Sequence, residues 1–235
     1  MKSSLLASTL AIASVAVAVP AGAATFSFDS STIGGNSSVG VHERIQTTYD
    51  TETDWFTWSS TFSPNPANGN LADGAWLVVS PGPNPKSHAQ EYVMFYLDGT
   101  VGNEQVSMYV YNGMNSSSSY VDNIYLGATD LQVEESGDER TFSFELDMTT
   151  INNLDIAAVN TDPTVTTDWV GTEFGEEVGI WFHGVEGLET AYNANGSLSD
   201  FSYSSQGWYD ARNLPTEQVP EPGLAFGLGF AAFAA

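Results

Sequence analysis

The sequence predicts an all-β protein, an antiparallel β-sandwich of the jelly-roll or concanavalin-like kind. Three observations support this prediction: two-residue alternation of apolar and polar residues, short apolar runs of strand length, and turn residues between them. Alternation places one strand face on a core and the other in water. Many short strands separated by turns are typical of sandwiches.

The clearest alternation lies in the middle of the chain, where Phe142, Phe144 and Leu146 alternate with Ser143 and Glu145. The apolar set is expected to face a core and the polar set water. Further strands are expected in short segments rich in aromatic and branched residues: 26–28, 55–62, 76–79, 92–97, 106–111, 180–182 and 201–203.

Turn residues separate these segments. Asn-Gly and Asp-Gly pairs, which favour tight hairpin turns, occur at 68–69, 73–74, 98–99, 112–113 and 195–196. The acidic stretch 134–139 also reads as a charged hairpin turn. A helical turn is expected only within residues 148–159, so the chain contains too little helix for an α/β fold.

The composition fits one exported globular domain. The 235 residues contain 5 Lys and Arg against 29 Asp and Glu, for a net charge of −24, and there is no cysteine. Phosphate binding needs clustered basic residues, so the charge argues against nucleic acid and anionic lipid as partners. Without cysteine there are no disulfides and no thiolate metal sites, and the fold depends on its core.

The N-terminus has the features of a secretory signal peptide over residues 1–23. Lys2 precedes an apolar run from Leu5 to Val19, and the small residues Ala21, Ala23 and Ala24 follow. A basic start, a short apolar run and a small-residue cleavage site define such a peptide. Cleavage is expected after Ala23, with Ala24 as the alternative. The folded domain would then span residues 24–213.

The last segment, residues 219–235, consists of a short Pro/Glu motif and an apolar run. After a linker at 214–218, Val219, Pro220, Glu221 and Pro222 form a stiff extended element, because each proline fixes φ and removes a backbone donor. Together with the signal peptide, this motif resembles the PEP-CTERM sorting segment of exported proteins from Gram-negative, often polysaccharide-producing bacteria.

The resemblance implies processing by a membrane protease of the exosortase type. It also implies residence in the cell envelope, on the outer surface or outside the cell, with membrane contact only through the C-terminal tail. The family pattern ends in a basic cluster, whereas this chain ends in Phe233-Ala234-Ala235. That difference, and an apolar run of 13 residues, leave it open whether the tail anchors the protein or is removed.

The residues give little support for an enzyme. His88 and His183 each precede a glutamate by three positions, at Glu91 and Glu186, which does not match the two-histidine spacing of zinc hydrolases. We expect His183 to end a strand and to hydrogen-bond locally. No Gly-x-Ser-x-Gly elbow is present for serine hydrolysis.

Glu145 and Asp147 share one face of a predicted strand, as paired glycosidase carboxylates can. The acidic strand of concanavalin-like glycosidases continues with a further Glu, but here Thr149 stands in that position. The pair is better interpreted as solvent-facing charge. The expectation is therefore a non-enzyme, with a cryptic glycan-active enzyme left as an alternative.

No cofactor is required by the sequence, but calcium is left open. Carboxylates in loops suit this ion, and Asp98, Asn103 and Glu104 form an acidic loop. Their spacing does not match an EF-hand.

Carbohydrate binding is the sharpest hypothesis for the domain itself. Sugar rings stack on aromatic side chains, and Trp208 and Tyr209 lie beside Asp210 and Arg212 in a segment without a clear strand pattern. Core packing is the alternative for any aromatic residue. We expect core packing for Trp76 and Trp181, which occur in strand-like runs.

These observations predict an exported surface or matrix protein associated with exopolysaccharide or biofilm. The alternative is a lectin-like carbohydrate-binding module.

Overall fold

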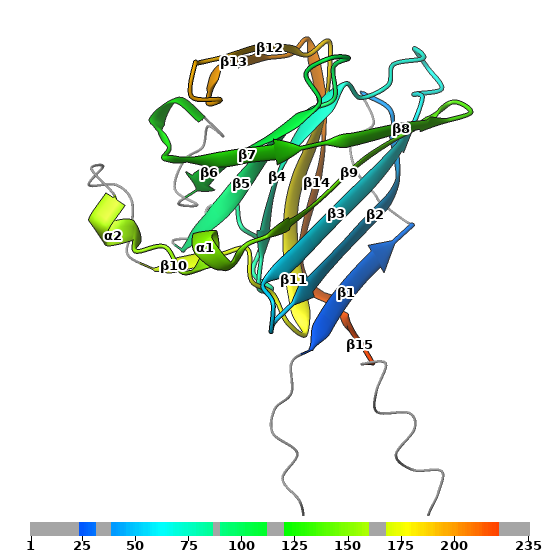
Figure 1. The fold of residues 1–235 in the computed structure, drawn as a ribbon. Helices are drawn as coiled ribbons and strands as arrows, with labels where there is room; N and C mark the ends of the chain where they lie inside the picture. Colours follow the sequence, from blue (N-terminus) through cyan, green and yellow to red (C-terminus); the bar gives the residue numbers. More distant parts are fainter. Residues whose placement is uncertain (1–23, 32–38, 87–89, 112–119, 160–167, 221–235) are drawn as a thin grey trace, which may run out of the picture.

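The computed structural model describes residues 24–31, 39–86, 90–111, 120–159 and 168–220. They form a β-sandwich in which strands dominate and the helices are short (Figure 1). The predicted all-β class and its antiparallel character are confirmed. One pair is an exception, because β10 (Trp169–Gly171) runs parallel to β5 (Glu91–Asp98).

Sheet A contains six strands in the order β15-β1-β2-β3-β9-β8, and each neighbouring pair is antiparallel. Its strands are β1 Thr25–Ser30, β2 Val41–Asp50, β3 Trp55–Ser63, β8 Gln132–Ser136, β9 Glu139–Asp147 and β15 Glu217–Val219. The predicted hairpin turn at 134–139 is confirmed, since β8 and β9 pair from Ser136 and Glu139 inward.

Sheet B contains strands in the order β14-β11-β4-β5-β6-β7, and β10 pairs with β5 in addition. Its other strands are β4 Gly74–Ser80, β6 Gln105–Tyr111, β7 Tyr125–Asp130, β11 Glu177–Glu186 and β14 Ser205–Pro215. A separate hairpin joins β12 (Glu189–Tyr192) and β13 (Leu198–Ser202). The remaining elements are η1 (Tyr120–Asp122), α1 (Thr149–Asn152) and α2 (Ile156–Val159).

The predicted strands are confirmed, except that Tyr203 lies just past the end of β13. The helical turn predicted within 148–159 is also confirmed, as α1 and α2. Within the described ranges, no helix has the length and apolar character needed to cross a lipid bilayer.

The main core fills the space between the two sheets. Alternation along the strands sends one set of aromatic side chains inward, as predicted for β9. Phe56 of β3 stacks on Phe95 of β5 with ring centroids 5.4 Å apart, and Trp58 lies 5.4 Å from Phe182 of β11. Each such buried side chain contributes roughly 1.5–3 kcal/mol, which lets a chain without disulfides fold.

A second apolar cluster lies on the outer face of sheet B. It includes Trp76 and Trp181, both buried as predicted, and Tyr96. The β12–β13 hairpin packs over part of this face: the ring of Phe201 lies 5.0 Å from Tyr96, and the Leu198 backbone N–H donates to the Tyr109 hydroxyl at 2.7 Å. Sheet B is therefore apolar on both faces, which explains the continuous apolar runs in its strands.

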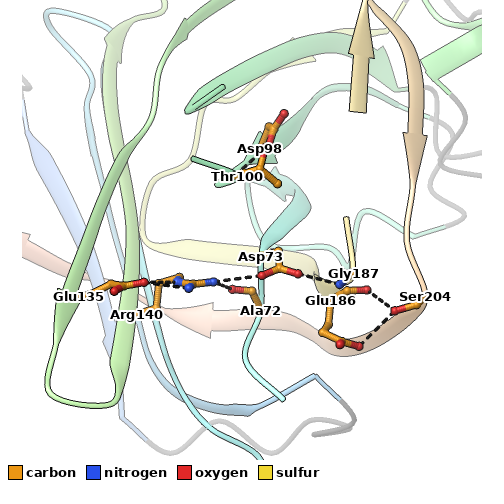
Figure 2. Close-up of polar contacts among 9 residues, drawn as sticks. All are labelled: Ala72, Asp73, Asp98, Thr100, Glu135, Arg140, Glu186, Gly187 and Ser204. Atoms are coloured by element: carbon orange, nitrogen blue, oxygen red, sulfur yellow. Dashed lines mark hydrogen bonds and ion pairs between the residues drawn. The ribbon is translucent and has the colours of Figure 1, made fainter. Parts of the chain in front are cut away.

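A polar network ties the two sheets together at one end of the sandwich (Figure 2). Arg140 of β9 donates to the Ala72 carbonyl at 2.7 Å and to Asp73 Oδ1 at 3.2 Å, just before β4. Its other nitrogens donate to Glu135 of β8. Asp73 Oδ2 accepts the backbone N–H of Gly187 at 2.7 Å. Gly187 has a φ of +66°, so this turn favours glycine.

Residues 214–218, predicted as a linker, are instead mostly strand. Leu214 and Pro215 end β14, and 217–219 form β15, which pairs with β1 so that Thr25 lies opposite Val219. A short polar strand flanked by prolines is compatible with a sheet edge, where unpaired positions need no donor. Both ends of the described domain therefore lie at the same edge of sheet A (Figure 1).

Candidate functional site

The segment around Trp208 is a regular strand, contrary to the sequence-based expectation of no strand pattern. Within β14, Trp208 and Asp210 are exposed, whereas Tyr209 between them is buried in the main core. Arg212 is exposed on the strand's outer side as well. Tyr209 was predicted as a sugar contact, and this is wrong: alternation turns its ring away from Trp208 and into the sandwich, leaving 8% of it exposed.

Trp208 is the exposed end of a row of aromatic rings that crosses the outer face of sheet B. It is 45% exposed and lies opposite His183 of β11 in the strand register. The two ring centroids are 6.5 Å apart. His183 stacks on Trp76 at 3.9 Å with an interplanar angle of 17°, and Trp76 meets Trp181 edge-on at 4.6 Å. The buried rings hold the row in place, so Trp208 presents a fixed apolar surface to solvent.

His183 is neutral at physiological pH and orients a neighbouring amide. Burial lowers its pKa to about 4. Its Nδ1 lies 3.2 Å from Gln206 Oε1, which also accepts the Tyr203 hydroxyl at 3.0 Å. An amide oxygen accepts, so Nδ1 carries the proton and Nε2 is left as an acceptor. The expectation that His183 hydrogen-bonds locally is confirmed, although it lies within β11 and not at its end.

Charged and amide groups lie on the other side of Trp208. Asp210 Oδ1 accepts the Asn84 side-chain amide at 2.6 Å, and the Lys86 ammonium lies 3.9 Å from Oδ2. The same ammonium lies 5.7 Å from the centroid of the Trp181 ring. Lys86 and Arg212 are two of only five basic residues in the chain, so this face is less negative than the protein as a whole.

The arrangement combines a flat exposed ring with donors and acceptors at its rim. Such a surface can stack on the apolar face of a pyranose while the rim groups hydrogen-bond to its hydroxyls.

The acidic loop predicted as a weak calcium site is used for structure. Asp98 is 1% exposed, and its Oδ1 accepts the backbone N–H and hydroxyl of Thr100 at 2.9 and 2.6 Å. Its Oδ2 accepts the hydroxyls of Thr190 and Tyr192 at 2.5 and 2.7 Å. With both oxygens engaged, Asp98 would have to give up these bonds to bind an ion.

The other two calcium candidates lie in the same loop but face solvent. The Asn103 amide donates to the Thr100 hydroxyl at 3.3 Å, and Glu104 accepts the Gly102 backbone N–H at 3.0 Å. In the described part of the chain, no group of three or more His, Asp or Glu side chains is arranged to hold a metal ion.

The carboxylates considered for glycoside cleavage lie on the outer face of sheet A. Asp147 Oδ1 accepts the Thr149 backbone N–H at 2.8 Å, where α1 begins, and hydrogen bonds from Thr149 lower its pKa. Asp147 thus serves the strand-to-helix turn. Glu145 lines a groove on this face.

The sorting and cleavage residues fall largely outside the described ranges. Ala24 lies at the start of the domain, where its backbone N–H donates to Thr51 Oγ1 at 3.1 Å. Val219 ends β15 and Pro220 follows it. The positions that lie outside the described residues are Ala21, Ala23, Glu221, Pro222 and His88.

Sequence reasoning missed most of the residues around Trp208. His183 and the segment with Asn84 and Lys86 are far from Trp208 in the sequence, and only the pairing of β11 with β14 and the turn after β4 bring them together. The one local indication was the spacing of polar residues at every second position around Trp208, which is typical of a solvent-facing strand side.

Comparison of the chain with protein-family models, with curated proteins and with solved structures found no match.

Proposed function

We propose that the domain binds glycans through the Trp208 face, as part of an exported cell-surface or extracellular-matrix protein. The observation that supports this most directly is the exposure of Trp208 beside hydrogen-bonding groups at its rim. A tryptophan ring contributes large contact area at little cost in conformational entropy. An exposed tryptophan held by buried neighbours contributes little to folding, so a ligand accounts for it better than core packing does.

Export and sorting are the second part of the proposal. The signal-peptide pattern and the PEP-CTERM-like segment support delivery to the cell envelope and processing by an exosortase-type enzyme. A polysaccharide-rich matrix is then the natural surrounding, and exopolysaccharide the natural partner. We further propose a jelly-roll or concanavalin-like relationship for the sandwich, and a binding role without catalysis.

The first experiment measures binding of the purified chain to dextran, hydroxyethylcellulose and alginate, with calcium and with EDTA. We expect saturable binding that free oligosaccharide competes away. Trp208→Ala should abolish it at this face, because the stacking surface is lost, while the fold is retained and the melting temperature falls by only about 2–4 °C. Val101→Ala is the control, since Val101 is an exposed apolar residue in the loop between β5 and β6.

Binding that Trp208→Ala leaves unchanged would contradict a role for this face. Absence of binding to every polysaccharide would leave a purely structural matrix role as the better proposal. Loss of binding in EDTA would place calcium in the site.

Processing is tested separately in cells that carry an exosortase. Pro220→Ala together with Pro222→Ala should leave an unprocessed precursor, because the stiff extended motif is removed. Pro215→Ala, a proline outside the motif, should be processed normally. Normal maturation of the double variant would rule out the sorting proposal.

A further inference from the structure

The outer face of sheet A carries a groove of approximately 740 Å³. Strands β2 and β3 form its floor, β1 lies along one side, and β9 with the end of β7 lies along the other. The side chains that face the groove are small and polar. They include Gln46, Thr48, Thr57, Ser59 and Glu145.

These side chains form rows across the strands, set by the register. Thr48 pairs with Thr57, and Thr57 pairs with Glu145. The next row places Gln46 opposite Ser59. The hydroxyls of Thr48 and Thr57 are 2.7 Å apart and share one hydrogen bond. Each hydroxyl both donates and accepts, so the floor offers a grid of hydrogen-bonding sites at strand spacing.

An exposed tryptophan lies on the same face. Trp55 begins β3 and is 41% exposed, and alternation puts it on the same side as Thr57 and Ser59. Of the six tryptophans, Trp55 and Trp208 are the two classed as exposed. They lie on opposite outer faces of the sandwich, because the main core occupies the space between the sheets.

The charge of the groove selects its ligand. Among the described residues, its ionisable lining groups are the carboxylates Asp29, Asp130 and Glu145, and none of them is basic. Arg44 pairs with Asp29 at 2.5 Å at the rim, and Gln46 donates to the same carboxylate at 3.2 Å. An anionic polymer would be repelled here, whereas neutral hydroxyls match the grid. Trp55 is not a lining residue, but it lies two positions before Thr57 on the same side of β3, where a sugar ring that extends from the groove can stack on it.

We propose that this groove is a second binding site, which takes a segment of neutral polysaccharide. Because the two outer faces point away from each other, one domain then holds two polymer chains and cross-links them. Cross-linking rests on the proposed function of the Trp208 face, but binding in the groove does not.

The test is an NMR titration of the isotope-labelled chain with cellohexaose and laminarihexaose as neutral probes and hexagalacturonate as the anionic one. We expect the neutral probes to shift the Trp55 indole N–H and the backbone amides of Thr57 and Ser59. Thr48→Val with Thr57→Val keeps the β-branched shape and removes two hydroxyls, so affinity in the groove should fall about tenfold or more. Trp55→Ala should weaken the same site.

The matched control is Thr61→Val with Thr141→Val. These two hydroxyls form a similar cross-strand pair at 2.9 Å on the same sheet, outside the groove lining. The control should bind like the wild type. Melting temperatures of both double variants check that the fold is retained.

Trp208→Ala separates this site from the Trp208 face. If both sites bind, Trp208→Ala and the Thr48→Val, Thr57→Val double variant each keep one working site. Each should still bind hydroxyethylcellulose but should no longer cross-link it, as measured by light scattering. If only the groove binds, Trp208→Ala changes nothing and the wild type does not cross-link. The groove proposal is overturned if the probes shift no groove residue, if hexagalacturonate binds there equally well, or if concentration-dependent dimerisation accounts for the shifts.

Discussion

Arg140 in sheet A donates a hydrogen bond to Asp73, which immediately precedes the first central strand of sheet B. The Arg140 side chain is 20% exposed, and the same guanidinium also contacts the Ala72 carbonyl and the Glu135 carboxylate. One side chain thus joins the β8–β9 hairpin to β4, and through Asp73 to the turn after β11 (Figure 2).

Replacing Arg140 should therefore destabilise the sandwich. We expect Arg140→Ala to lower the free energy of unfolding by about 1–3 kcal/mol, because it leaves the Ala72 carbonyl and Asp73 without this donor. Urea unfolding measures the change. Arg44→Ala is the matched control: Arg44 pairs with Asp29 in an exposed position, where ion pairs contribute little. Equal losses in the two variants would contradict the sheet-joining role.

Asp98 should behave as a structural carboxylate. Asp98→Ala removes the acceptor for Thr190 and Tyr192, and should lower the free energy of unfolding by about 3 kcal/mol. Tyr192→Phe should lower the free energy of unfolding less, because only the hydrogen bond from the Tyr192 hydroxyl is lost and the Asp98 carboxylate keeps its other partners. Since the Asp98 oxygens are already occupied, the wild-type melting temperature should be equal in calcium and in EDTA. A calcium-dependent rise that Asp98→Asn removes would show that this residue binds the ion.

His42 should make stability depend on pH between about 4 and 6.5. Its ring lies in the core against Phe62 and Phe182, with centroids 4.5 and 5.0 Å away, and neither nitrogen has a hydrogen-bond partner within the described structure. Burial, with a smaller effect from His183, lowers its pKa to about 4. In this window the unfolded chain takes up a proton that the folded chain does not, so stability falls as the pH falls.

The loss from His42 should reach about 3 kcal/mol on going from pH 6.5 to pH 4, and His183, whose pKa is also lowered to about 4, should add a further loss of the same sign. His42→Leu should flatten the profile over this range when unfolding is followed by fluorescence. A profile of unchanged slope in the variant would show that His42 is not responsible. Carboxylates whose pKa is lowered in the folded protein, such as Asp29 and Asp50, make stability depend on pH only below this range.

Trp208 and Tyr209 are neighbours that should respond in opposite ways. Tyr209→Ala opens a cavity in the main core and should lower the free energy of unfolding by about 3–5 kcal/mol. Trp208→Ala removes a ring that is 45% exposed, so it should lower the free energy of unfolding far less, while binding at the Trp208 face is lost. Calorimetry and the polysaccharide assay together distinguish the two roles. A large stability loss for Trp208→Ala would show that the ring is structural.

Strands that bury mostly apolar residues could be predicted from the sequence, whereas the long strand β2 could not. The segments 76–79 and 92–97 are apolar on both faces because sheet B is covered on both sides, so their composition alone identifies them. In β2, however, core positions are filled by His42 and Thr47. Ile45 and Tyr49 are also buried in β2, but the polar residues at the other buried positions interrupt the apolar alternation that would identify the strand.

Only the part of the Trp208 face that forms a local sequence pattern could be predicted. Trp208 itself was identified because an aromatic residue beside charged ones is a local pattern. Its neighbours His183 and Lys86 depend on strand register and on a turn, which are set by contacts between distant parts of the chain. The groove in sheet A is made of serines and threonines that have no distinctive pattern until the strands are aligned.

The pairing of Thr25 with Val219 determines how the protein would move once it is held at a surface. Because β1 and β15 are paired, attachment through either end would hold the domain at the same edge of sheet A, and the rest of the sandwich would extend away from that edge. Polymer strands on both sides would then have access to the domain, and tension in the tail would act first on the short β15 edge before it reached the core.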